Sequence, residues 1–381
     1  MKRISQICVC VLLVLCLCLS LCACGKTQTP AAETAEETAE SRSQTETAAE
    51  PETAEADEKP VTLVMSTSKN QSESGGIFLD YFCDRAEELS GGSVSFERYY
   101  GGTLASSQEE MSMLSNGAIG VAAIMGNQCA DALPLLQFPD VGFDSNEKTT
   151  DYFRYMLLEN EATAQLLAEE AAASNIKYLG YFTGGTRVWF SKTPIASLAD
   201  GQGKIFGGMA GLALMEELGF STVATAPPDS YESLSRGIVD LCGLNLIAAC
   251  NMMWYEVASN VTIYGAYASG SPLVINLDVW NSLSEKQQQA LEQAAAEACD
   301  YSLQYVNDNE GEYIGKLENE WGASVYYFGE EDAAVYRDKA LYVGCLDAYT
   351  RASGIGLTDN MQTILQACAD YWDTDISAIF S

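Results

Sequence analysis

The sequence contains no histidine, which removes most of the acid–base and metal chemistry available to an enzyme. Ser-His-Asp and Cys-His arrangements and histidine-ligated zinc are all excluded. Asp308, Glu310 and Glu312 form an acidic cluster, but they fall in a predicted helix and lack the loop spacing of a calcium site. We therefore interpret them as a solvated helix face. We expect no catalytic residue, no cofactor and no metal, and no local motif marks a hydrolase with paired carboxylates.

Polar residues follow two of the predicted strands. Ser68 and Lys69 come directly after the strand at 61–67, and Asn127 follows the strand at 120–125. Ligand sites of open α/β sheets lie at the carboxyl ends of the strands. We therefore expect Lys69 or Ser68, and Asn127, to line a binding cleft.

The elements around these residues predict an α/β fold with two units. The first unit alternates strands and helices, at 61–67, 76–90, 94–100, 106–118 and 120–125. The second unit repeats the pattern, at 204–209, near 210–218, 221–226, 229–236 and 239–245. Such alternation is typical of parallel sheets with crossover helices. Further strands are expected at 177–182, 186–192 and 272–276, the last returning to the first unit.

A long helix is predicted at 284–321. Ser284 followed by Gln287 is the signature of a capping box. If Gly311 and Gly315 do not break it, the helix would be about 54 Å long, which is more than one lobe needs, so we expect it to brace both. The expected limits are 61–184 plus about 272–312 for lobe I, 185–271 plus about 313–350 for lobe II, and C-terminal helices at 351–381.

The amino terminus predicts export. A basic start precedes an apolar run at residues 7–22, which is typical of a secretory signal. The stretch Leu-Cys-Ala-Cys resembles the bacterial lipoprotein signal, whose cysteine becomes the lipidated first residue. Cys24 follows a small alanine, whereas Cys22 follows a leucine, so we expect cleavage after residue 23 and a lipid on Cys24. An ordinary cleaved signal and an uncleaved anchor are the alternatives.

Residues 24–60 differ from the rest of the chain. From residue 25 onward they contain ten acidic and three basic side chains, and no aromatic or large aliphatic one. Such a segment cannot bury enough apolar surface to fold, and we interpret it as a disordered acidic tether. The chain as a whole has a formal net charge of −33, which disfavours nucleic acid as a partner.

The folded body contains an odd number of cysteines and no C-x-x-C spacing. They are Cys83, Cys129, Cys242, Cys250, Cys299, Cys345 and Cys368. We expect most of them to be buried thiols, with one bridge between Cys242 and Cys250 left open.

Five segments together resemble the TRAP-transporter solute-binding proteins. Their order and spacing agree with that family over nearly all of residues 61–340. They are SGGSVSFERYYGGTLASSQEEMSMLSNGAIGVAAIM (90–125), LPLLQFPDVGF (133–143), GGTRVWFSKTPIASLADGQGKIFGG (184–208), YESLSRGIVDLCGLN (231–245) and VWNSLSEKQQQAL (279–291).

The resemblance implies a two-lobed periplasmic-binding-protein-like fold, class II-like, with lobes joined by crossing strands and a long spanning helix. It implies a lipid-anchored receptor on the outer face of the cytoplasmic membrane. That receptor would capture a small organic acid and deliver it to TRAP-type membrane subunits. The alternative is a sensor that passes its liganded state to a membrane signalling protein.

The resemblance also assigns ligand contacts. The family arginine that holds the ligand carboxylate matches Phe206 here, so that charge is missing. Arg187 matches a second, earlier arginine that faces the cleft in many members, although it could instead be structural and pack near Trp189. Asn245 matches a family asparagine, with a turn-forming role as its alternative.

Three further side chains are weighed beside these. Lys204 could substitute for the missing charge if its strand stays regular. Trp189 and Tyr231 could line the cleft, although core positions are commoner for such residues. We hypothesise a ligand with one acid group, held by Arg187, and an apolar or aromatic part near Phe206.

Overall fold

Two β-sheets organise the part of the chain that the structure describes. This computed structural model describes residues 59–209, 211–268 and 270–380. The predicted signal peptide, Cys24 and the tether up to residue 58 lie outside these ranges. The described residues belong to one compact unit that begins at Asp57.

The first sheet has five strands in the order β2-β1-β3-β11-β5. The strands are β1 Val61–Ser66, β2 Val94–Tyr99, β3 Val121–Ala123, β5 Ile176–Phe182 and β11 Ser271–Asn276. β1 pairs in parallel with β2 and β3, whereas β11 pairs antiparallel with β3 and β5. The expected return of strand 272–276 to the first unit is therefore confirmed.

The second sheet has seven strands, with β12-β10-β6-β9-β7-β8 in order and β4 paired to β10. The strands are β4 Val141–Phe143, β6 Gly185–Ser191, β7 Ile205–Gly208, β8 Ser221–Ala224, β9 Leu241–Asn245, β10 Asn260–Ala268 and β12 Ser324–Tyr327. β7 lies parallel to both β8 and β9, as a β-α-β unit requires. The lobe limits at 184/185 and 271/272 stay a prediction.

The chain crosses between the sheets where consecutive strands belong to different sheets. β5 leads into β6 through Thr183 and Gly184, and β10, which ends at Ala268, is followed along the chain by β11, which begins at Ser271. The sequence did not predict β4. This strand precedes β5 in the chain but pairs with β10 of the second sheet. Two of the ligand residues proposed from sequence, Arg187 and Asn245, lie beside the first of these crossings.

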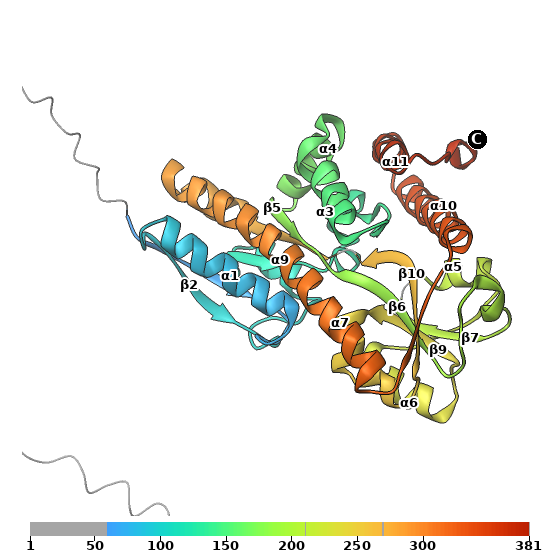
Figure 1. Cartoon of the computed structure of the whole chain (residues 1–381). Coiled ribbons are helices and arrows are strands. Elements are labelled where there is room, and N and C mark those ends of the chain that lie inside the picture. The colour runs from blue at the N-terminus through green and yellow to red at the C-terminus, as the bar shows by residue number, and fades with distance from the viewer. Residues whose placement is uncertain (1–58, 210, 269, 381) are drawn as a thin grey trace, which may run out of the picture. The chain divides into compact units, whose positions relative to one another are not determined.

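The spanning helix α9, Glu285–Asn319, is continuous through Gly311 and Gly315. Its capping box is formed: the Ser284 hydroxyl accepts from the Gln287 N–H at 3.2 Å, and the Gln287 amide oxygen accepts from the Ser284 N–H at 3.1 Å. α9 packs on α1 and β5 at one end and on β6, α7 and β12 toward the other. It therefore passes both sheets, as Figure 1 shows.

The other helices cover the faces and edges of the two sheets. They are α1 Ser74–Leu89, α2 Glu110–Ser115, α3 Asn146–Arg154, α4 Glu161–Ala173, α5 Leu212–Glu217, α6 Pro227–Arg236, α7 Leu246–Asn251, α8 Leu277–Ser282, α10 Glu330–Gly354 and α11 Thr358–Trp372. α2 is shorter than the helix predicted at 106–118. No helix in the described ranges combines the length and apolar character of a membrane span.

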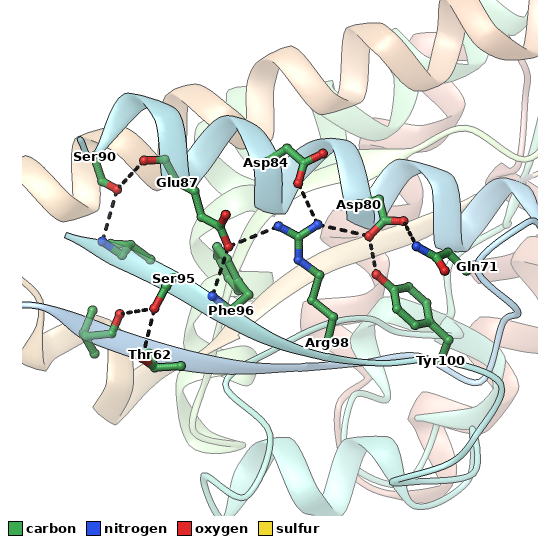
Figure 2. A network of polar contacts seen from close by, with 12 residues as sticks. Thr62, Gln71, Asp80, Asp84, Glu87, Ser90, Ser95, Phe96, Arg98 and Tyr100 are labelled. Atoms are coloured by element: carbon green, nitrogen blue, oxygen red, sulfur yellow. Dashed lines mark hydrogen bonds and ion pairs between the residues drawn. The ribbon is translucent and has the colours of Figure 1, made fainter. Parts of the chain in front are cut away.

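One arginine fastens α1 to the edge strand β2. The Arg98 guanidinium lies 2.7 Å from Asp84, 3.2 Å from Asp80 and 3.1 Å from Glu87 (Figure 2). Three carboxylates on one helix face therefore surround a single cation. This arginine is committed to structure and is not available for a ligand.

The seven body cysteines are all free and buried. The bridge between Cys242 and Cys250 that the sequence left open is not formed. Burial raises the pKa of both thiols, to about 11 for Cys242 and about 12 for Cys250. They are inert core residues at neutral pH.

Candidate ligand-binding site

Arg187 and Asn245, two of the contacts proposed from sequence, lie directly opposite each other on neighbouring strands. β6 and β9 pair antiparallel, and these two residues are partners in the register. Partners across an antiparallel pair point to the same face of the sheet, so their side chains are neighbours. Asn245 ends β9, and β9 runs parallel to β7 and β8. The pair therefore sits at the carboxyl edge of these strands, where ligand sites of α/β sheets form.

The Asn245 side chain has a fixed orientation. Its amide nitrogen donates to the Gly184 carbonyl at 2.9 Å. Its amide oxygen is buried and has no hydrogen-bond partner among the described residues. Although Asn245 occupies the position before α7, its side chain makes no capping bond, so the turn-forming alternative does not account for that oxygen. An unpaired buried acceptor is costly unless a ligand or water satisfies it.

Arg187 carries a matching unpaired donor. The residue is half-buried, and its Nε atom is buried with no hydrogen-bond partner among the described residues. One side chain thus offers a buried donor and the adjacent side chain a buried acceptor. A carboxylate with a neighbouring hydroxyl group would satisfy both.

The surroundings of Arg187 keep it charged. Burial acts to lower the pKa of the guanidinium, but nearby groups outweigh it and the pKa is raised overall. Those groups are the Asp140 carboxylate and the hydroxyls of Tyr264, Tyr336 and Tyr181. A permanently charged guanidinium in a confined site is suited to an anion.

An aromatic wall lies on the same face of the second sheet. Trp189 follows Arg187 by two residues, is buried, and stacks on Tyr264 with ring centroids 4.4 Å apart. The Tyr264 ring also contacts Tyr336 of α10, with ring centroids 4.7 Å apart. Trp189 is therefore a core residue that supports the site from below, which is the alternative weighed for it.

Phe206, the position of the missing arginine, is 5% exposed and belongs to this apolar cluster. Its ring lies over Gly243 of the adjacent strand, where a side-chain carbon would come within 3.1 Å of it. Gly243 is the register partner of Trp189, two residues along the strands from the pair formed by Arg187 and Asn245. The ring fills space beside the site without supplying a charge.

Lys204 and Tyr231 lie outside this site. The Lys204 ammonium donates to the Thr193 hydroxyl at 2.9 Å, so it does not replace the missing arginine. The Tyr231 hydroxyl donates to Glu256 at 2.9 Å on an exposed surface. Of the two basic residues weighed as anion contacts, Arg187 is therefore the one that lies beside Asn245.

The candidates from the first sheet form a separate group. Lys69 is half-buried after β1, and Asn127 is exposed in a short turn, Gly126–Gln128, after β3. Beside Lys69, the buried Glu110 carboxylate accepts from the Ser68 N–H at 2.7 Å. No contact among the described residues joins this group to Arg187 or Asn245. The two groups would meet only around a ligand or after a movement.

Two hollows in the described chain lie away from these residues. One, of about 390 Å³, lies between the start of α10 and the loops that flank α5 and includes Leu198, Glu217 and Asp332. The other, of about 270 Å³, is lined by residues of α3, β5 and α9, including Arg154, Tyr181 and Asp300. Neither contains Arg187 or Asn245.

One prediction about the acidic cluster was wrong. Asp308 and Glu312 are exposed, but Glu310 is 8% exposed and bonds to Thr186 and Asn146. The helical spacing of Ser302, Val306 and Glu310 was the signal that could have revealed this face.

Residues 64–343 match the bacterial extracellular solute-binding proteins of family 7, represented by DctP. This match covers most of the chain and includes both sheets and the spanning helix. The chain belongs to this family. It is a two-lobed α/β solute-binding protein of the TRAP type, as the sequence predicted.

Curated relatives and solved structures agree with the match. A solute-binding protein of Sulfitobacter sp. (strain NAS-14.1) is 24% identical over 287 residues, covering 74% of this chain and 84% of that protein. The C4-dicarboxylate-binding periplasmic protein DctP of Rhodobacter capsulatus is 24% identical over 230 residues, covering 58% and 66%. Both relatives are named as binding proteins.

Two solved TRAP periplasmic solute-binding proteins show the same fold. One from Ochrobactrum anthropi has a TM-score of 0.70 and 20% identity, covering 82% of this chain and 97% of its own. Another, from Sulfitobacter sp. NAS-14.1 with bound β-D-galacturonate, has a TM-score of 0.64 and 17% identity, covering 81% and 99%. The family favours extracytoplasmic solute capture over the sensing alternative.

Proposed function

We propose that this solute-binding protein captures a small organic monoacid that also carries a hydroxyl group. The Arg187 guanidinium binds the carboxylate through its Nε and a terminal nitrogen, and the Asn245 amide oxygen accepts from the hydroxyl. The observation that carries the proposal is the pair of unsatisfied buried atoms, one donor and one acceptor, on register partners. Lys69 and Asn127 approach the ligand from the first sheet when the lobes close.

A single cation favours a single carboxylate. Phe206 stands where the resemblance expects the arginine that holds the ligand carboxylate, and it is buried in the apolar cluster beside Gly243. A second carboxylate of a dicarboxylate would lie near this ring without a partner and would pay the full cost of its desolvation. A uronate such as the β-D-galacturonate bound to the Sulfitobacter structure has one carboxylate and several hydroxyls. We therefore assign the ligand to that chemical class, with the apolar face of its ring toward Phe206.

Calorimetric titration tests the assignment. D-galacturonate, D-glucuronate, benzoate and succinate are titrated into the full-length chain, into Arg187→Ala and Asn245→Ala, and into the control Lys204→Ala. We expect a monoacid to bind to the unsubstituted chain. Arg187→Ala should weaken its affinity by roughly 100-fold, about 2.7 kcal/mol, and Lys204→Ala should leave the affinity unchanged. Equal affinity of Arg187→Ala and the unsubstituted chain would contradict the proposal, as would a preference for succinate.

The membrane partners are also part of the proposal. We propose a lipid on Cys24 and delivery of the ligand to TRAP-type membrane subunits, with the acidic tether giving the receptor its reach. Both rest on the LCAC motif and on the family, because Cys24 lies outside the described residues. The Cys24→Ala protein should lack the added mass of a lipid in mass spectrometry. It should also be lost from the membrane fraction. Retention of that lipid mass on Cys24→Ala would place the modification elsewhere.

A further inference from the structure

One face of the spanning helix holds the crossing between the two sheets. Ser302, Val306 and Glu310 are spaced four residues apart on α9 and are buried, so they lie in one row. The Thr183 N–H donates to the Ser302 hydroxyl at 3.3 Å. At Gly185, a side-chain carbon would lie 3.0 Å from Val306 and 2.6 Å from a Glu310 oxygen. The crossing segment therefore runs directly along this row.

Glu310 makes the strongest of these contacts. Its carboxylate accepts from the Thr186 N–H at 2.5 Å, from the Thr186 hydroxyl at 2.6 Å and from the Asn146 amide of α3 at 2.9 Å. Burial raises the pKa of Glu310, and these three hydrogen bonds oppose that rise because they favour the ionised carboxylate. Three elements, α9, β6 and α3, are thus fixed at one buried carboxylate.

The same crossing segment supports both ligand contacts. Thr186, which Glu310 holds through its main chain, immediately precedes Arg187. The carbonyl of Gly184 accepts from the Asn245 amide and so directs the free Asn245 oxygen. A change in the path of the segment from Gly184 to Thr186 would move the donor and the acceptor together.

We propose that Glu310 is a positioning residue for the ligand site. Its carboxylate fixes the crossing segment on the spanning helix, and this holds Arg187 and Asn245 in the arrangement that receives the ligand. Preorganisation of this kind raises affinity because the site pays no ordering cost on binding. The inference rests on the proposed function only in taking Arg187 and Asn245 as the ligand contacts.

The test compares Glu310→Ala and Glu310→Gln with a control on the same helix. Leu291→Ala removes a buried side chain of α9 in the core against the first sheet, and should cost about 2–5 kcal/mol of stability. Two measurements are made on the full-length chain at a temperature where every variant is folded. The first is the Nε–H NMR signal of Arg187 without ligand, assigned with Arg187→Lys. The second is the calorimetric affinity for D-galacturonate.

We expect Glu310→Ala to shift or broaden the Nε–H NMR signal of Arg187. It should also weaken the affinity for D-galacturonate by about 10-fold or more, about 1.4 kcal/mol. Glu310→Gln, which keeps an acceptor for the Thr186 N–H, should retain most of both. Leu291→Ala should lose stability and change neither. An unmoved Arg187 signal in Glu310→Ala would overturn the proposal, as would an equal shift in Leu291→Ala. If the unsubstituted chain does not bind D-galacturonate, the ligand assignment fails, and the Arg187 signal alone decides the role of Glu310.

Discussion

At the scale of single residues, two carboxylates whose pKa values are raised by burial make the stability of the protein depend on pH. Glu110 is 1% exposed, and burial raises its pKa to about 7 against the opposing effects of the Ser68 N–H and of Lys69. Glu170 behaves in the same way, because burial raises its pKa to about 7 although two backbone N–H groups bind it. A carboxyl whose pKa is higher in the folded state binds more protons folded than unfolded. The contribution of such a carboxyl to stability is therefore greatest below about pH 4.5, and it falls as the pH rises toward 7.

We expect Glu110→Gln to reduce this pH dependence. The amide stays neutral, so the variant should avoid a loss on the order of 2 kcal/mol that the carboxyl suffers between pH 5 and 7, with solvent screening allowed for. The slope is reduced rather than removed because Glu170 still contributes. Urea unfolding at pH 5 and pH 7 measures it. Glu109→Gln, at an exposed neighbour whose pKa is lowered, is the matched control, and an unchanged slope in Glu110→Gln would refute the assignment.

At the scale of elements, the crossing into β6 requires a glycine. Gly185 has φ +83°, and an added Cβ would lie 2.6 Å from a Glu310 oxygen. Gly315 lies within the continuous helix α9, and nothing lies within 4 Å of its added Cβ. The same substitution should therefore have opposite effects at the two sites.

We expect Gly185→Ala to lower the free energy of unfolding by roughly 2 kcal/mol, through its positive φ and the displaced carboxylate. Gly315→Ala should raise it by about 0.5–1 kcal/mol, because alanine is the better helix former. Thermal or urea unfolding of both variants measures the difference. Equal shifts in the same direction would show that the crossing does not constrain residue 185.

Much of this element order could be predicted from the sequence. Ser284 and Gln287 predicted the start of α9, and the return of β11 to the first sheet followed from its position. β4 was not predicted because three residues carry no periodicity and its pairing with β10 is a tertiary contact. Glu310 was placed in solvent for the same reason: the partner that compensates its burial, Thr186, lies 124 residues earlier.

The candidate site could be predicted only in part. The resemblance selected Arg187 and Asn245 and showed that Phe206 replaces an arginine. Their register pairing and the unsatisfied Nε and amide oxygen are tertiary facts that no local pattern contains. Lys204 was weighed as a substitute charge because alternation alone does not reveal its bond to Thr193.

At the scale of the whole molecule, two sheets carry two separate groups of polar residues. Arg187 and Asn245 belong to the second sheet, and Lys69 and Asn127 follow strands of the first. We propose that a hinge movement about the crossings brings both groups onto one ligand, because a ligand that binds the closed state better stabilises that state.

The decisive measurement is a crystal structure of the complex with the bound monoacid. We expect a carboxylate within about 3 Å of the Arg187 Nε, a ligand hydroxyl donating to the Asn245 amide oxygen, and no charged ligand group against Phe206. We also expect Lys69 or Asn127 to contact the ligand from the first sheet. A ligand whose carboxylate is bound by other residues, with Arg187 Nε still unpaired, would contradict this expectation.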